Sequence, residues 1–336
     1  MSHSRLISII MPVYNGEEYI AARLDNLIAF CNNSIELIVI NDGSTDRSYT
    51  ICQEKLSNLP NIKIITQENK GLSEARNTGI KAAEGDYIIF LDSDDILIQD
   101  GLTQIVDSLE FCKPDVLMGK LLTIPPNGRI IKPNYTFPDA TSASESRVFI
   151  YNEVHDCIWH AVRYVCRRDF LLNNSLLFVP GIICEDMEWS PRVLGCANSI
   201  VFINAPFYGY YYNRAGSITK SVMFKRILDT NKIVSESIPK YIDEDYGKAL
   251  AYRLILESFY NISRYCKCSK EQRKVLHPII INTSELYPYA ASGLVKLFIK
   301  TKSFIPLYMW SVALFLAREF RGLFKNILGP LRTIRI

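Results

Sequence analysis

Three aspartates stand within four residues, directly after a short apolar segment. Residues 87–91 have the aromatic and branched composition of a buried strand, and Asp92, Asp94 and Asp95 follow them. Carboxylates this close repel one another unless a positive group lies among them. Mg²⁺ and Mn²⁺ suit that place, because they favour oxygen ligands and often share them with substrate phosphates. The alternative is that these acids only cap a helix that begins near Ile96.

The preceding sequence alternates between strands and helices. Strands are predicted at 7–13, 35–40 and 62–66, and helices over 17–30 and 71–84. This alternation predicts a doubly wound α/β domain, in which the loops after the strands meet on one rim. Ligands bind at that rim in open α/β sheets. It would hold Tyr14 and Asn15, Asp42 and Gly43, and the acidic residues.

The rim residues have the chemistry of a nucleotide site. The Asp42 carboxylate can accept a hydrogen bond from a base, a Tyr or Pro can pack on that base, and Arg76 can form a fork with phosphate. Asp42 can equally serve only the turn that contains it. Neither G-x-G-x-x-G nor G-x-x-x-x-G-K-[ST] occurs, which disfavours a dinucleotide Rossmann site and a P-loop.

Four segments in this order resemble the catalytic domain of glycosyltransferase family 2, of GT-A fold. They are residues 9–15, 39–46, 69–79 and 85–95. The resemblance implies a Rossmann-like, doubly wound mixed sheet and a nucleotide-sugar site. In the D-x-D motif that it implies, Asp92 and Asp94 hold Mn²⁺ or Mg²⁺, with Asp94 the more direct ligand. The implied nucleotide contacts are Pro12, Val13, Tyr14, Asn15, Glu17, Asp42, Gly43, Arg76, Asp92 and Ser93.

A second acidic pair, Glu185-Asp186, resembles the E-D motif of the same family. The resemblance implies that Asp186 is the general base and that Glu185 assists it. An acceptor hydroxyl that attacks an anomeric carbon needs a carboxylate to take its proton. The leaving diphosphate needs no acid, because a metal can neutralise it. Both acids can also simply face the positive end of a helix.

The acceptor is expected to contact the part of the chain that follows. A tyrosine-rich segment at 207–219 resembles one that many family members carry, and alternate tyrosines can stack on sugar rings. Core packing is the alternative for each of them. The predicted acceptor or phosphate contacts are Trp189, Tyr212 and Arg214.

Composition and charge divide the chain into a catalytic domain and a basic tail. Its 336 residues are 48% hydrophobic and 22% charged, with a net charge of +3. Residues 287–336 hold eight Lys or Arg against one acid, so the body is not a uniformly basic nucleic-acid binder. We expect a catalytic domain at 1–219, with a nucleotide-sugar half to about residue 120 and an acceptor half from 121. Residues 220–336 are expected to be helical.

The tail predicts attachment to a membrane surface. The apolar run at 303–317 is shorter than the ~20 residues that a spanning helix needs, and Lys302 and Arg318 bound it. An amphipathic interfacial helix fits this pattern, and a buried helix is the alternative. Nine cysteines without a C-x-x-C pair indicate a reducing compartment. We therefore expect a cytoplasmic protein on the inner face of the cell membrane, with a homo-oligomer possible.

These observations predict an inverting hexosyl- or N-acetylhexosaminyltransferase that adds one sugar at a time. The donor would be a UDP-sugar, and the acceptor a lipid-linked intermediate of O-antigen, capsule or another cell-surface polysaccharide. A sugar-nucleotide nucleotidyltransferase is one alternative, but residues 12–18 lack its Gly-rich basic loop. A non-catalytic glycan-binding scaffold is the other, and it would have lost acids that are present here.

Overall fold

The computed structural model describes residues 6–32, 34–57, 59–139, 142–154, 156, 158–212, 223–262, 265 and 268–284. The chain divides into two compact units, Met1–Ser217 and Ile218–Ile336. Arg214 and the basic tail from residue 287 lie outside the described residues, so the predictions made for them stay predictions. Among the helices of the described ranges, none is long and apolar enough to cross a membrane.

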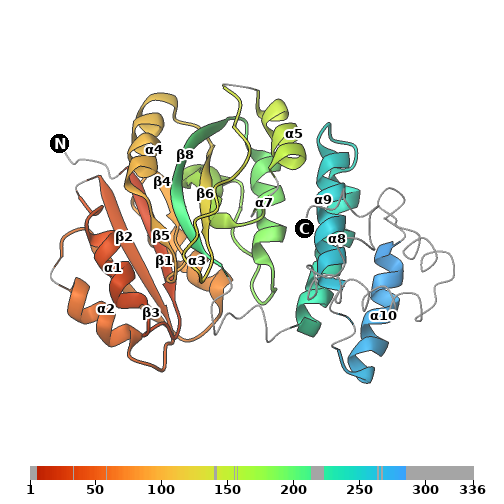
Figure 1. Cartoon of the computed structure of the whole chain (residues 1–336), viewed down its shortest axis with the longest axis horizontal. Coiled ribbons are helices and arrows are strands. Elements are labelled where there is room, and N and C mark those ends of the chain that lie inside the picture. Colours follow the sequence, from red (N-terminus) through yellow and green to blue (C-terminus); the bar gives the residue numbers. More distant parts are fainter. Residues whose placement is uncertain are drawn as a thin grey trace. The chain divides into compact units, whose positions relative to one another are not determined.

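The first unit is built on one eight-stranded mixed sheet (Figure 1). The strand order is β3-β2-β1-β4-β7-β6-β8-β5. β3, β2, β1 and β4 run parallel, as do β6 and β8, whereas β7 is antiparallel to both of its neighbours and β5 is antiparallel to β8. The strands are β1 (Ile7–Val13), β2 (Ile35–Asp42), β3 (Ile62–Gln67), β4 (Tyr87–Phe90), β5 (Ile96–Leu97), β6 (Val116–Ile124), β7 (Tyr164–Arg167) and β8 (Ile200–Tyr211).

Helices follow most of these strands, as the alternating pattern predicts. α3 packs against β1 and β2, and α4 packs against β8. The contact of α3 is close because residue 79 is glycine: a Cβ there would lie 2.3 Å from Cγ2 of Ile10. The helices are α1 (Ile20–Ile28), α2 (Ser48–Leu56), α3 (Leu72–Ala82), α4 (Gln99–Cys112), α5 (Ala143–Glu153), α6 (Arg168–Asn173) and α7 (Glu185–Cys196), with a 3₁₀ turn at Ala161–Arg163.

A buried carboxylate fixes the entry into β4. Glu36 of β2 is fully buried, and a buried charge is tolerated only when it is bonded. Its Oε1 accepts from Ser8 Oγ at 2.6 Å, from Glu84 N at 2.7 Å and from Gly85 N at 3.2 Å. This residue therefore ties the turn before β4 to β1 and β2, and so sets where the acidic residues after β4 emerge.

One local prediction was wrong. No helix begins near Ile96, because this residue pairs with Gly209 in the short strand β5 and α4 begins only at Gln99. The three aspartates therefore do not cap a helix. The segment after residue 120 begins inside the sheet, because β6 runs between β7 and β8 up to Ile124.

The second unit is helical over its described residues between 223 and 284, as its pattern predicts. It contains α8 (Met223–Tyr241), α9 (Gly247–Ile262) and α10 (Lys270–Ser284). α8 packs against both α9 and α10. Together with Tyr265 and Cys268, which lie between α9 and α10 in the chain, these helices form a core that includes Ile227, Ile262, Leu276 and Ile280.

Candidate active site

The acidic loop, residues 92–95, leaves β4 at the rim of the sheet. One carboxylate oxygen from each of Asp92, Asp94 and Asp95 lies within 4.8 Å of the other two. A turn closes the loop, because Asp95 N donates to Asp92 O at 2.9 Å. Oxygen ligands at this spacing suit a hard divalent cation.

Asp95 is the buried member of the acidic loop, and β8 supplies its partners. Tyr208 Oη donates to Asp95 Oδ2 at 2.8 Å, and Tyr211 N donates to Asp95 Oδ1 at 2.8 Å. Burial and then the charge of Asp92 raise the pKa of Asp95 to about 8. The Tyr208 hydroxyl also accepts from Asp92 N at 3.2 Å. One tyrosine thus holds both ends of the acidic loop.

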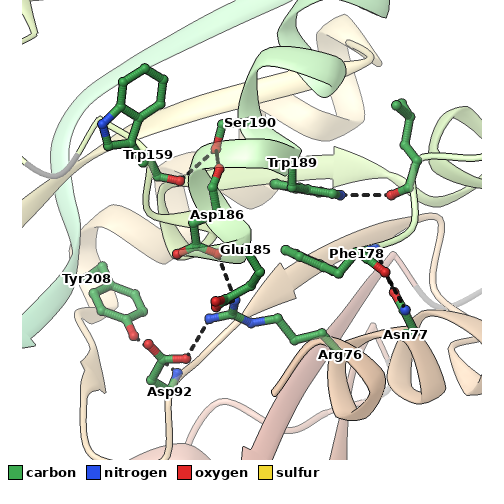
Figure 2. Close-up of polar contacts among 11 residues, drawn as sticks. Arg76, Asn77, Asp92, Trp159, Phe178, Glu185, Asp186, Trp189, Ser190 and Tyr208 are labelled. Carbon is green, nitrogen blue, oxygen red and sulfur yellow. Dashed lines mark hydrogen bonds and ion pairs between the residues drawn. The ribbon is translucent and has the colours of Figure 1, made fainter. Parts of the chain in front are cut away.

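Arg76 of α3 joins the acidic loop to the second acidic pair (Figure 2). Its Nη2 donates to Asp92 Oδ1 at 2.9 Å. Its Nη1 donates to Asp186 Oδ1 at 2.7 Å and to Glu185 Oε1 at 3.0 Å. The Arg76 side chain is only 1% exposed, so its charge is shared by these three carboxylates. Its expected contact with a donor phosphate stays a prediction.

The residue after Arg76 positions the segment that leads into α7. Asn77 Nδ2 donates to Phe178 O at 2.9 Å, and Phe178 N donates back to Asn77 Oδ1 at 2.8 Å. The ring of Phe178 lies 5.2 Å from Cζ of Arg76, and that of Phe90 lies 5.8 Å from it. Consecutive residues of one helix therefore hold the guanidinium and the aromatic surface against which it packs (Figure 2).

Glu185 and Asp186 form the first turn of α7. The helix starts abruptly, because Cys184 before it has the left-handed φ of 68°. Acids in a first turn interact favourably with the helix dipole. Burial and then the charge of Asp186 raise the pKa of Glu185 to about 7, while Arg76 opposes the rise.

Asp42 ends β2 and receives three hydrogen bonds. Gln67 Nε2 donates to its Oδ1 at 2.7 Å, Lys70 N donates to the same oxygen at 3.0 Å, and Gly71 N donates to Oδ2 at 2.8 Å. A carboxylate offers about four acceptor positions, so one remains. Gly43 follows at φ +70°, where a Cβ would lie 2.7 Å from Asn69 N. The Asp42 carboxylate therefore stabilises the loop at residues 67–71, and its contact with a base stays a prediction.

The residues after β1 brace the neighbouring loop. Asn15 Oδ1 accepts from Thr45 N at 2.8 Å, and Glu17 Oε2 accepts from Arg47 N at 2.9 Å. Tyr14 is 44% exposed and is thus available to a ligand. The other predicted nucleotide contacts near the rim, Pro12, Val13 and Ser93, are buried.

Comparison with known proteins identifies the family. Residues 8–170 match the model of "Glycosyl transferase family 2". EpsJ of Bacillus subtilis, described as an uncharacterized glycosyltransferase, is 32% identical over 275 residues, which cover 78% of this chain and 72% of EpsJ. This chain belongs to glycosyltransferase family 2. The resemblance carried by the four sequence segments is confirmed.

Two solved structures share the fold of this family 2 chain. TarS 1-349 of S. aureus, in complex with UDP-GlcNAc, has a TM-score of 0.73 and 22% identity, covering 94% of this chain and 92% of that one. The mannosyltransferase PcManGT from Pyrobaculum calidifontis, in complex with GDP-Man and Mn²⁺, has a TM-score of 0.52 and 12% identity, covering 95% and 88%. These likenesses confirm the predicted GT-A-like α/β fold.

The acidic loop of this family 2 chain fits a divalent cation. It brings three carboxylate oxygens together, and Arg76 is bonded to one of these acids, Asp92. Both oxygens of Asp95 are already bonded to β8. The assignment of Asp92 and Asp94 as the ligands of the ion stays a prediction.

One predicted acceptor contact was wrong. Trp189 is fully buried, its Nε1 donates to Leu176 O at 2.8 Å, and its ring stacks on Phe178 with centroids 4.6 Å apart. It packs against Phe178, whose ring contacts Arg76, and it is too buried to touch an acceptor (Figure 2). Tyr212 is exposed at the end of β8, with its ring 6.5 Å from that of Tyr210.

Proposed function

We propose that this family 2 member is an inverting, metal-dependent enzyme that moves one sugar per encounter from a UDP-sugar to a saccharide acceptor. The bridge made by Arg76 carries the proposal, because it joins Asp92 to Asp186 and Glu185. A place for a leaving diphosphate and a place for a base thus lie next to each other. Transfer between two bound substrates requires such proximity.

The donor nucleotide would lie along the rim formed after β1, β2 and β4. Tyr14 would pack on the base, and the remaining acceptor position of Asp42 would bind its imide N–H. The complex of TarS with UDP-GlcNAc supports a UDP-sugar, here a hexose or an N-acetylhexosamine.

Asp92 and Asp94 would hold Mg²⁺ or Mn²⁺. When bound, the cation neutralises charge on the departing diphosphate. The complex of PcManGT with Mn²⁺ supports this choice of cation. Arg76 would keep the Asp92 carboxylate oriented while the donor arrives.

Asp186 would act as the general base. Its carboxylate would take the proton of the acceptor hydroxyl as that oxygen attacks the anomeric carbon from the face opposite the diphosphate. Arg76 holds the Asp186 carboxylate in place through the bond of 2.7 Å. Glu185, whose pKa is raised to about 7, would hold a proton much of the time at neutral pH and orient the acceptor.

We propose a lipid-linked saccharide at the inner face of the cell membrane as the acceptor. The charge of residues 287–336, with eight Lys or Arg against one acid, supports contact with an anionic surface. Such an acceptor fits an intermediate of O-antigen, capsule or another cell-surface polysaccharide.

The test begins with a panel of UDP-sugars and Mn²⁺. A donor at a hundredfold its Kd should raise the free energy of unfolding by about 2.7 kcal/mol. The stabilising donor is then incubated with the wild type, Asp94→Asn and the control Asp100→Asn, whose exposed carboxylate lies on α4. Metal-dependent release of UDP should be lost only in Asp94→Asn. Equal release by all three proteins, or no stabilising donor, would contradict the proposal.

A further inference from the structure

A hairpin at residues 123–132 extends β6 beyond the sheet. Its turn is closed by Gly128 N, which donates to Pro125 O at 2.9 Å, and Gly128 takes the φ of +72° that this turn needs. Thr123 and Ile131 exchange both backbone hydrogen bonds, at 3.0 and 2.8 Å. These three bonds define the backbone course of the hairpin.

The returning segment of this hairpin, residues 129–132, is apolar and basic. Ile130 and Ile131 are 53% and 54% exposed, although large aliphatic side chains are usually buried. Successive residues of an extended chain point to opposite sides, and both isoleucines are exposed, so neither side of this returning segment is covered. Arg129 and Lys132 flank the two isoleucines and are also exposed. No acid occurs between Asp115 and Asp139.

The base of the hairpin adjoins the active-site rim. Thr123 pairs with Tyr210 of β8, and Tyr212 N donates to Ile124 O at 3.0 Å. Between Tyr210 and Tyr212, Tyr211 bonds Asp95 of the acidic loop. The returning segment, which pairs with Thr123 through Ile131, therefore begins beside the proposed acceptor side of the site.

We propose that residues 125–132 dip into an anionic membrane surface. The interfacial layer would take up Ile130 and Ile131, and lipid phosphates would pair with Arg129 and Lys132. This contact would orient the active-site rim toward the bilayer, so that a lipid-linked acceptor could reach Asp186. Only that delivery rests on the proposed function, because the surface contact depends on the hairpin alone.

Hydrogen exchange of the full chain on vesicles tests the contact locally. Phosphatidylcholine vesicles with phosphatidylglycerol should slow exchange of the amides at 127–132, and pure phosphatidylcholine vesicles should do so much less. The double variant Ile130→Ser/Ile131→Ser should lose that protection. Phe111→Ser is the matched control, because Phe111 is 91% exposed on α4, and it should behave as the wild type.

The basic residues are tested by sedimentation with the same vesicles. Arg129→Gln and Lys132→Gln should each weaken partition of the full chain by about fivefold at low salt. Unchanged exchange at 127–132 while the chain sediments with vesicles would overturn the proposal. Protection that depends on protein concentration without vesicles would overturn it too, since it would mark a contact between copies of the chain. All these readings are made without donor, so they are independent of UDP release.

Discussion

Arg76 Nη1 lies 2.7 Å from Asp186 Oδ1, although 110 residues separate the two in the chain. The other terminal nitrogen of Arg76 bonds Asp92, and Glu185 shares the first. Three carboxylates thus depend on one buried guanidinium, which leaves an excess of negative charge. A divalent cation at Asp92 would balance that excess.

Removal of Arg76 should destabilise the first unit strongly. Arg76→Met leaves Asp92, Glu185 and Asp186 without their counter-charge, so the free energy of unfolding should fall by about 3–5 kcal/mol. Urea denaturation measures it, and added Mn²⁺ should restore part of the loss. Lys55→Met is the control: its pair with Asp25 is exposed, so it should cost less than about 1 kcal/mol. Equal losses in the two variants would contradict the role of Arg76.

Asp186→Asn should lose turnover and keep the donor. A general base contributes roughly 10²- to 10⁴-fold, and the replacement is nearly isosteric. Turnover and UDP-sugar affinity are measured together, with Glu188→Gln as the control, because Glu188 lies on the same helix but pairs with Arg192. If Asp186→Asn keeps more than about a tenth of the activity while Glu185→Gln is inactive, the two roles are exchanged.

The raised pKa of Glu185 predicts that the free energy of unfolding falls as pH rises. Burial and the charge of Asp186 raise its pKa from 4.5 to about 7 in the folded state. Between these values the folded chain binds more protons than the unfolded chain, so this group lowers the free energy of unfolding as pH rises through that window. Tm measured across the window should fall less steeply in Glu185→Gln than in the wild type. Identical slopes in Glu185→Gln and the wild type would refute the assignment.

Tyr208→Phe should weaken the cation site. It removes the donor to Asp95 Oδ2 and the acceptor for Asp92 N, and each unsatisfied buried group costs about 1–3 kcal/mol. The matched control is Tyr87→Phe, since Tyr87 is also buried and its hydroxyl donates to Pro114 O at 3.1 Å. Both variants should lose stability, but only Tyr208→Phe should bind Mn²⁺ more weakly by calorimetry. Equal Mn²⁺ affinity in the two would show that Tyr208 serves packing alone.

Local patterns in the sequence were enough to predict the strand before the acidic loop and the alternation of the first half. The short, continuous apolar segments at 7–13 and 87–91 are typical of buried strands. The partners of Arg76 could not be predicted in this way, because its three bonds reach residues 16, 109 and 110 positions away. Such contacts are set by the packing of the whole sheet.

One residue was wrongly assigned and one was missed. Trp189 lies on the same side of α7 as Asp186, which is three positions earlier, but its ring is fully buried against Phe178, which helix spacing alone does not show. The role of Tyr208 could not be predicted from the sequence, because a tyrosine in a strand can equally pack in the core or contact a ligand. Its bonds to the acidic loop depend on β5 and β8 lying side by side.

The place of β7 in the sheet bears on how the chain folds as it is synthesised. β7 comes late in the sequence but lies between β4 and β6, which precede it. Until residue 167 leaves the ribosome, the inner edges of β4 and β6 have no partner, and unpaired edges invite aggregation. We therefore predict that the expected nucleotide-sugar half, to about residue 120, does not fold by itself. A fragment that ends after β6 should collect in inclusion bodies, and one that includes β8 should fold.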